Sequence, residues 1–345
     1  MTNRQLMKAV GFYRSDLPLS NPESIMDLEL EKPVPTGKDL LVRVKAISVN
    51  PVDVKTRTSG KSDHNNPQIL GWDAAGIIEQ VGPDCILFKP GDEVYYAGDV
   101  DRPGCNSEFH LVDERIVGRK PRTLNYAQAA AMPLTSLTAW EALFDRLGVN
   151  QNELENKNRT ILIIGAAGGV GSVATQFSKL AGLTVIGTAS REESVRWAKD
   201  HGADYIINHR EALGPQLKAY GFDFVDYIFC LNDTVFHWES MAEVIRPQGK
   251  ICSIVPAGKP VNLDSFFVKS VSFHWELMFT RAKFQTDDML EQHHLLNTVA
   301  DLIDVGKIKP TMTQRLEPIN AANLRLAHEK LLAGDMIGKL VLERF

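Results

Sequence analysis

The chain has 345 residues, which is more than one hydrophobic core usually supports, so two domains are expected. Hydrophobic residues make up 44% and charged residues 23%, as in an ordinary globular protein. The net charge of -5 comes from 38 basic and 43 acidic residues without a block of one sign, which argues against a nucleic-acid or anionic-membrane partner. A small neutral or anionic metabolite remains compatible with this charge.

Membrane insertion, export and disulfide bonding are all disfavoured by the sequence. The longest apolar stretch, residues 161–173, contains five glycines or serines and is shorter than the roughly 20 apolar residues of a membrane helix. Residues 1–8 become polar too early for a secretory signal. The cysteines at 85, 105, 230 and 252 form no CxxC or short CxxH pair, so reduced thiols are expected. These features predict a cytoplasmic protein.

The first third of the chain predicts a small β-barrel. Residues 41–46 alternate between apolar and polar, and turn-forming sequences recur at residues 35–37, 82–84 and 89–92. Short strands separated by frequent turns are typical of small barrels.

From about Asn158 the sequence predicts a parallel sheet with covering helices. Residues 160–164 form a continuous apolar run that ends in glycines, as expected of a strand buried on both faces. A helix should follow, ended by Gly182, because apolar residues recur at helical spacing: Val173, Ala174, Phe177, Leu180 and Ala181. Further strands are predicted at residues 184–187, 205–207, 227–230 and 250–255. This alternation predicts an α/β, doubly wound fold, and a helix from near Asn320 to Gly334 and a strand at 339–342 end the chain.

The turn between the first of these strands and its helix is a candidate dinucleotide site. Its glycines are Gly165, Gly168, Gly169 and Gly171, with Val170 between the last two. Residues without a Cβ let the backbone approach a pyrophosphate, and the helix start offers free N–H groups. The alternative is a glycine-rich turn without a ligand.

The next strand end indicates which dinucleotide the chain prefers. An NAD enzyme places a carboxylate there, on the ribose hydroxyls, whereas this sequence has Ser190 and Arg191. A hydroxyl and a guanidinium suit the 2′-phosphate of NADPH. His209 and Arg210, after the following strand, would add a second clamp. The alternative for all of these is a solvated surface charge.

Several motifs resemble one protein family. Residues 166–171, with Gln176 and Lys179 on the helix, resemble the zinc-free quinone oxidoreductase (zeta-crystallin-like) branch of the medium-chain dehydrogenase/reductase superfamily. Four more segments agree, in the order of the family: residues 48–53, 70–76, 88–94 and 132–139. The resemblance runs from about residue 8 to 342 and is closest to the subgroup of zinc-type alcohol dehydrogenase-like proteins.

The resemblance implies a domain organisation and partners. Residues 1–130 and 310–345 would form a GroES-like β-barrel catalytic domain, and residues 131–309 a Rossmann NADPH-binding domain. It also implies NADPH as the cofactor, a small-molecule substrate and a homodimer.

The zinc ligands of related enzymes are missing. Zinc relatives use a Cys, a Gly-His-Glu segment and a later Cys, and the matching positions here are Asn50, Gly71–Trp72–Asp73 and Leu134. A catalytic zinc needs about three nitrogen, sulfur or carboxylate ligands, and only Asp73 qualifies. Alcohol oxidation would lack its Lewis acid, so the expected reaction is metal-free reduction of a quinone or an α,β-unsaturated carbonyl by hydride transfer.

The resemblance also implies catalytic residues. Asn50 matches the active-site Asn of the family and would donate to the developing enolate oxygen or orient the site; the alternative is a turn Asn before Pro51. Asp53 would orient the site or cap a helix. Thr138 matches a Thr near the nicotinamide, or is a helix hydroxyl. Relatives often carry a Tyr two residues after the Asp, where this chain has Lys55, so the proton donor stays open, with solvent as one choice.

Two further clusters have simpler explanations. The stretch His274–Phe279 would line a pocket or belong to a core or a subunit interface. His293 and His294, near Glu291, suggest a metal, but adjacent helical residues point about 100° apart, which favours a solvated face. Two rival functions remain, a zinc alcohol dehydrogenase and a non-catalytic NADPH-binding protein.

Overall fold

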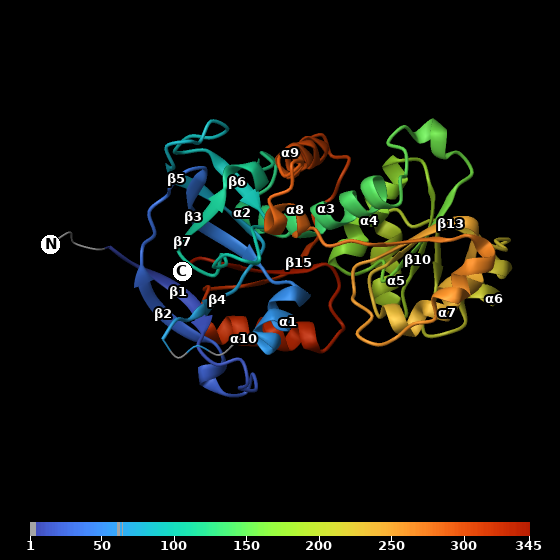
Figure 1. Ribbon diagram of the computed structural model, residues 1–345, viewed down its shortest axis with the longest axis horizontal. Coiled ribbons are helices and arrows are strands. Elements are labelled where there is room, and N and C mark those ends of the chain that lie inside the picture. The colour runs from blue at the N-terminus through green and yellow to red at the C-terminus, as the bar shows by residue number, and fades with distance from the viewer. Residues whose placement is uncertain (1–4, 61–62, 64) are drawn as a thin grey trace. The chain divides into compact units, whose positions relative to one another are not determined.

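The computed structural model describes residues 5–60, 63 and 65–345. Residues 1–4, which belong to the N-terminal segment 1–8 that argued against a secretory signal, lie outside the described part. The chain divides into two compact units, Met1–Leu134 with Phe279–Phe345 and Thr135–Met278 (Figure 1). Among the described residues, none of the helices has the length and apolar character needed to cross a membrane.

The first unit is built on two sheets. One has the order β2-β1-β4, and the other has the order β15-β16-β3-β5-β6-β8, with β7 also paired to β3. The strands are β1 (Leu6–Phe12), β2 (Met26–Glu31), β3 (Asp39–Ser48), β4 (Gln68–Ile69), β5 (Ala74–Val81), β6 (Glu93–Tyr96), β7 (Phe109–Asp113), β8 (Val117–Arg119), β15 (Met312–Leu316) and β16 (Lys339–Glu343). Leu40, Val42 and Val44, every second residue of β3, lie together in the core of this unit, as the alternating sequence pattern predicts.

The helices of the first unit include a segment that the sequence assigned to the other domain. They are α1 (Pro51–Ser59), α2 (Tyr126–Ala130), α8 (Thr280–Phe284), α9 (Glu291–Asp304) and α10 (Ala321–Leu332). Tyr95 Oη donates a 2.6 Å hydrogen bond to the Leu296 carbonyl, and Leu296 packs against Gly118. Residues 279–309 therefore belong to this unit, and the boundary lies at 278/279 instead of the expected 309/310. The sequence could not show this, because α9 packs on strands that are distant in the chain.

The second unit is a doubly wound α/β domain, as predicted. Its sheet has the order β11-β10-β9-β12-β13-β14, and every neighbouring pair is parallel. The strands are β9 (Thr160–Ile164), β10 (Thr184–Thr188), β11 (Tyr205–Ile207), β12 (Val225–Cys230), β13 (Ile245–Ser253) and β14 (Ser272–Trp275). The helices are α3 (Pro133–Trp140), which begins at the boundary, α4 (Gly169–Leu180), α5 (Glu192–Asp200), α6 (Leu213–Ala219) and α7 (Thr234–Val244).

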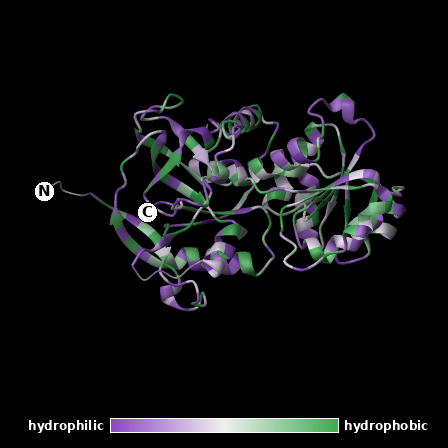
Figure 2. Cartoon of the chain, viewed as in Figure 1, coloured by the Kyte–Doolittle hydropathy of each residue, from purple (hydrophilic) through white to green (hydrophobic). Residues whose placement is uncertain are grey.

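Strand β9 shows why the sequence was informative in this unit. Ile161–Ile164 are fully buried, and Figure 2 shows hydrophobic residues distributed through both units. Helix α4 stops before Gly182, which has φ +80°, and buries the predicted apolar residues except Leu180, whose side chain is exposed. Because β10 and β12 lie on opposite sides of β9, the turn after β9 is the switch point of the sheet, where such folds bind ligands.

Candidate functional site

The glycine turn has the geometry of an anion cradle. Gly165 has φ +95°, which favours glycine. A Cβ on Gly171 would overlap the Gly165 carbonyl and lie 2.7 Å from Ala166 Cα. On Gly168 it would meet nothing closer than 3.6 Å, so the absence of a side chain there leaves space open. The turn therefore needs glycine at Gly171 for its own packing and offers room at Gly168.

The start of α4 completes this cradle. Its N-cap, Gly168, provides no side-chain cap, and the hydrogen bond from Ser172 N to Gly168 O (2.9 Å) is the first of the helix. The N–H groups of Gly169, Val170 and Gly171 precede that bond, at the positive end of the helix dipole. An anion such as a pyrophosphate fits this helix start. The residues present thus fit a dinucleotide cofactor.

The predicted specificity residues lie at neighbouring strand ends. Thr188 and Ile207, the last residues of β10 and β11, are paired, so Ser190–Arg191 and His209–Arg210 follow adjacent strands. Arg191 is exposed and begins α5, with its backbone N–H donating to Ser194 Oγ at 3.1 Å. Binding of a 2′-phosphate by these residues remains a prediction.

A buried threonine connects the glycine turn to this edge. Thr188 Oγ1 accepts a 3.0 Å hydrogen bond from Gly165 N and lies 3.2 Å from His209 Nδ1. Burial, and then the charge of Arg210, lower the pKa of His209. The imidazole is therefore held by Thr188 and favours its neutral form in the absence of an anion.

In the first unit, the candidate catalytic residue Asn50 lies in a buried polar cluster, which we call the lysine cluster: Asn50, Asp53, Asp73 and Lys339. Asn50 Nδ2 donates to Asp73 Oδ2 at 2.9 Å and makes a longer contact of 3.3 Å with the Ser48 carbonyl. Lys339 Nζ donates to Asn50 Oδ1 and, at 3.0 Å, to Asp73 Oδ2. Lys339 is not among the residues predicted from the sequence, because a lysine at the start of a strand resembles a surface residue.

Asp53 stabilises the start of helix α1, but from its first turn and not from the N-cap position that was the alternative in the sequence. Asn50 is the N-cap of α1, and Asp53, in the first turn, accepts a 2.6 Å hydrogen bond from Asn50 N. Burial raises the pKa of Asp53 to about 7, although the hydrogen bond from Asn50 and the charge of Lys339 oppose the shift. Asp53 therefore stabilises the backbone beside Asn50 and retains a proton more readily than an exposed aspartate.

The residues at the family's zinc positions do not fit zinc. Trp72 is buried, and its indole N–H donates to the Asp99 carbonyl at 3.1 Å. Leu134 contributes its backbone N–H, which donates to Asp73 Oδ1 at 2.8 Å. Both oxygens of Asp73 are thus occupied by donors of the chain. Within residues 5–60, 63 and 65–345 no three His, Cys, Asp or Glu side chains come together as a metal site would require.

The remaining sequence candidates lie elsewhere. Thr138 is buried on α3 of the second unit. His293 Nδ1 contacts the Val117 carbonyl at 2.7 Å, whereas His294 is exposed beside Glu291, so the two rings face different surroundings. Trp275 is half exposed.

The stretch after β14 contains a second buried ionic group, formed by Glu276, Glu141 and Arg146. Arg146 Nε donates to Glu276 Oε2 at 2.9 Å, and both carboxylates are almost fully buried. Glu141 and Arg146 lie on a π-helix, Glu141–Arg146. Burial, and then the Glu141 carboxylate, raise the pKa of Glu276 to about 9.

Comparisons with known proteins identify the family of the chain. Residues 36–133 match the alcohol dehydrogenase GroES-like domain, and residues 201–342 match the zinc-binding dehydrogenase family. A zinc-type alcohol dehydrogenase-like protein of Staphylococcus epidermidis is 41% identical over 97% of this chain and 99% of its own length.

Two solved structures are similar over almost the whole chain. One, from Rhizobium etli and proposed to be a zinc-dependent alcohol dehydrogenase, has 50% identity, a TM-score of 0.94 and coverage of 99% of both chains. The other, a quinone oxidoreductase of Coxiella burnetii, has 26% identity, a TM-score of 0.81 and coverage of 99% of this chain and 100% of that chain. The chain therefore belongs to the medium-chain dehydrogenase/reductase superfamily of oxidoreductases, close to the zinc-type alcohol dehydrogenase-like proteins.

Proposed function

We propose that this oxidoreductase uses NADPH to reduce quinones or α,β-unsaturated carbonyl compounds without a metal ion. The observation that carries the proposal is the glycine turn with the uncapped start of α4. Ser190 and Arg191 follow the adjacent strand, β10. They stand where an NADH-specific enzyme would have a carboxylate that binds the ribose hydroxyls. The similarity to the quinone oxidoreductase of Coxiella burnetii supports the substrate class.

In this proposal, different residues bind the cofactor and contact the substrate. The N–H groups of 169–171 bind the pyrophosphate, and Ser190, Arg191, His209 and Arg210 bind the 2′-phosphate. A reduced nicotinamide supplies hydride when bound. Asn50 donates a hydrogen bond to the substrate oxygen that gains negative charge. Asp53 holds the backbone of Asn50, and solvent supplies the proton.

The activity is tested with the purified protein and a panel of 1,4-benzoquinone, cyclohexenone, a 2-alkenal and primary alcohols. We expect NADPH to be consumed with a quinone or an enone, and alcohols to be oxidised slowly or not at all. Rapid alcohol oxidation without quinone or enone turnover would show an alcohol dehydrogenase. Tight NADPH binding without any turnover would show a non-catalytic binding protein.

A metal control accompanies the panel. Because Asn50, Trp72 and Leu134 provide no zinc ligands, chelation should leave the turnover unchanged, and elemental analysis should find no stoichiometric zinc. One zinc per chain, lost together with activity, would contradict the metal-free reaction.

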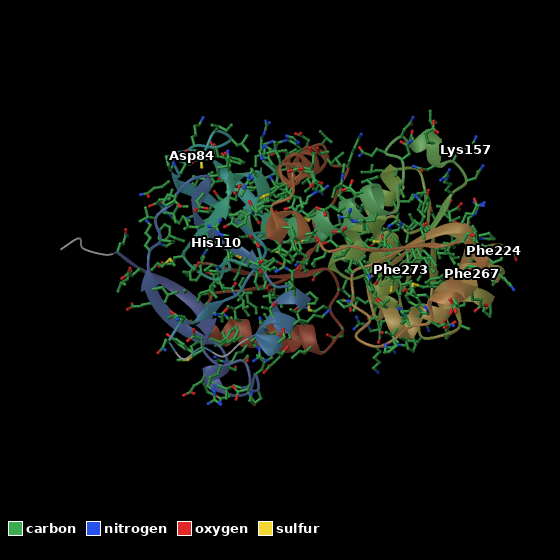
Figure 3. The ribbon with its side chains drawn as sticks, in the orientation of Figure 1. Asp84, His110, Lys157, Phe224, Phe267 and Phe273 are labelled. Atoms are coloured by element: carbon green, nitrogen blue, oxygen red, sulfur yellow. The ribbon has the colours of Figure 1, made fainter. Side chains whose placement is uncertain are left out.

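We also propose that the protein is a homodimer. Strand β14 ends the sheet of the second unit, and unpaired strand edges readily pair with another chain. Phe273 on β14 packs against Trp238 inside its unit, whereas Phe267 nearby is 79% exposed (Figure 3). Light scattering should give twice the chain mass of 38.4 kDa, and a charge at Phe267, in Phe267→Glu, should weaken the dimer. A monomer at all concentrations contradicts this proposal.

A further inference from the structure

Lys339 is buried, and its ammonium is fully used by the protein. The residue is 4% exposed, and Nζ donates to three oxygens: Asn50 Oδ1, Asp73 Oδ2 and the Val49 carbonyl. An ammonium has three donors, so all of them are satisfied. Lysine is rarely buried unless it is paired. A buried and fully paired lysine beside Asn50 therefore indicates a specific role for Lys339 there.

The ammonium and the Asp73 carboxylate together allow one orientation of the Asn50 amide. The carbonyl oxygen Oδ1 faces Lys339, and Nδ2 faces Asp73 Oδ2 at 2.9 Å. A rotated amide would place its NH2 group against the ammonium and its oxygen against the carboxylate. Both contacts would then be repulsive, so the side chain is fixed from both ends.

The second hydrogen on Asn50 Nδ2 is held less firmly. Its acceptor is the Ser48 carbonyl at 3.3 Å, which is longer than the usual range of about 2.7–3.2 Å. Nδ2 can therefore redirect this hydrogen bond from the Ser48 carbonyl to a stronger acceptor at little cost in free energy. A substrate oxygen that gains negative charge is such an acceptor.

We propose that Lys339 is a positioning residue, which fixes the Asn50 amide so that its second Nδ2 hydrogen is presented to the substrate oxygen. This inference rests on the proposed reductase function. Preorganised donors stabilise developing charge without reorienting during the reaction. The groups that support such donors determine how precisely the donors are oriented. The positive charge of the site is then the ammonium of Lys339. In this cluster, Asn50 and Asp73 stand at positions that match zinc ligands of the zinc-dependent relatives.

The first test is Lys339→Met, which keeps the length of the side chain and removes its charge. We expect kcat to fall by about ten- to a hundredfold, somewhat less than the loss of a complete oxyanion donor. The KM for NADPH should change by less than about twofold, because the residues proposed to bind it belong to the second unit. A lowered kcat with an unchanged cofactor KM separates positioning from general damage.

Lys120 provides a matched control. It is also buried in the first unit, at 8% exposure, and its Nζ donates to the carbonyls of Pro121 (3.0 Å) and Leu124 (2.8 Å). Lys120→Met should therefore lower the melting temperature as Lys339→Met does. Its kcat, corrected for the folded fraction, should stay within about twofold of the wild type.

A double variant separates charge balance from positioning. Lys339→Met alone leaves the buried Asp73 carboxylate without its cation, whereas Lys339→Met with Asp73→Asn removes both charges. The double variant should recover stability but keep the low kcat. The inference is overturned if kcat recovers together with stability, or if Lys339→Met alone keeps wild-type kcat.

A measurement without substrate distinguishes this inference from the proposed function. In protein labelled with 15N-asparagine, the Asn50 side-chain signal is assigned with Asn50→Ser. Its solvent exchange should be slow in the wild type and at least about tenfold faster in Lys339→Met. If no acceptor in the panel is reduced, the proposed function fails, and this signal still reports on Lys339. Equal exchange rates in the two proteins refute the positioning role.

Discussion

Replacing Arg191 with alanine should lower kcat/KM for NADPH about ten- to a hundredfold and leave kcat/KM for NADH nearly unchanged. A hydrogen bond to a charged group contributes roughly 1.5–3 kcal/mol, and NADH lacks the phosphate that would accept it. Because the 2′-phosphate is remote from the transferred hydride, the loss should appear mainly in KM, as uniform binding lost in the ground and transition states. Steady-state kinetics with both cofactors measures it.

Arg196 on the same helix is the control for Arg191. Its side chain is 70% exposed and makes a long ion-pair contact of 4.0 Å with Glu192. Arg196→Ala removes the same charge a little further along α5 and should leave the preference between cofactors unchanged. If the wild type prefers NADH, or if Arg191→Ala weakens both cofactors equally, Arg191 is a surface charge without a role in specificity.

Replacing Glu276 with glutamine should stabilise the protein increasingly as the pH rises from 5 to 8. Burial and the Glu141 carboxylate raise the pKa of Glu276 from the ordinary 4.5 to about 9. Between these values the folded protein keeps a proton that the unfolded chain releases, so the free energy of unfolding of the wild type falls with rising pH. One proton corresponds to a slope of at most ~1.4 kcal/mol per pH unit.

The glutamine variant should lack this part of the pH dependence. Its amide keeps an acceptor for Arg146 and a donor for Glu141, without a proton that must be retained. Thermal unfolding of both proteins across this pH range measures the difference, with Glu193→Gln as an exposed control on α5. If the two stabilities stay parallel from pH 5 to 8, the buried carboxylates do not hold a proton.

The sequence predicted the second unit well because its signals are local. A strand buried on both faces must be apolar throughout, as in Ile161–Ile164, and the helix after it must show one apolar face. The glycine turn lies between them at a fixed place. The errors here concern one strand and one side chain: β13 runs from Ile245 to Ser253 and not from 250 to 255, and Leu180 faces solvent.

The lysine cluster could not be predicted in this way. Asn50 and Asp73 were found as positions that match a family, but their partner Lys339 lies 266 residues beyond Asp73 and meets it only because β16 pairs with β3. Nothing in the local sequence distinguishes a lysine that will be buried from one that will be solvated. The same holds for Glu141 and Glu276, whose pairing depends on the packing of a π-helix near the end of β14.

The late position of β16 in the chain has a consequence for synthesis on the ribosome. The second unit, Thr135–Met278, is continuous and contains all six strands of its sheet before β16 is made. Until residues 339–343 emerge, the part of β3 that pairs with β16 is an open strand edge, and Asp73 lacks its ammonium partner. Since domains fold as units while synthesis proceeds, the second unit can fold during translation, whereas the first unit cannot complete its sheet before β16 is made and is the part that chaperones would protect.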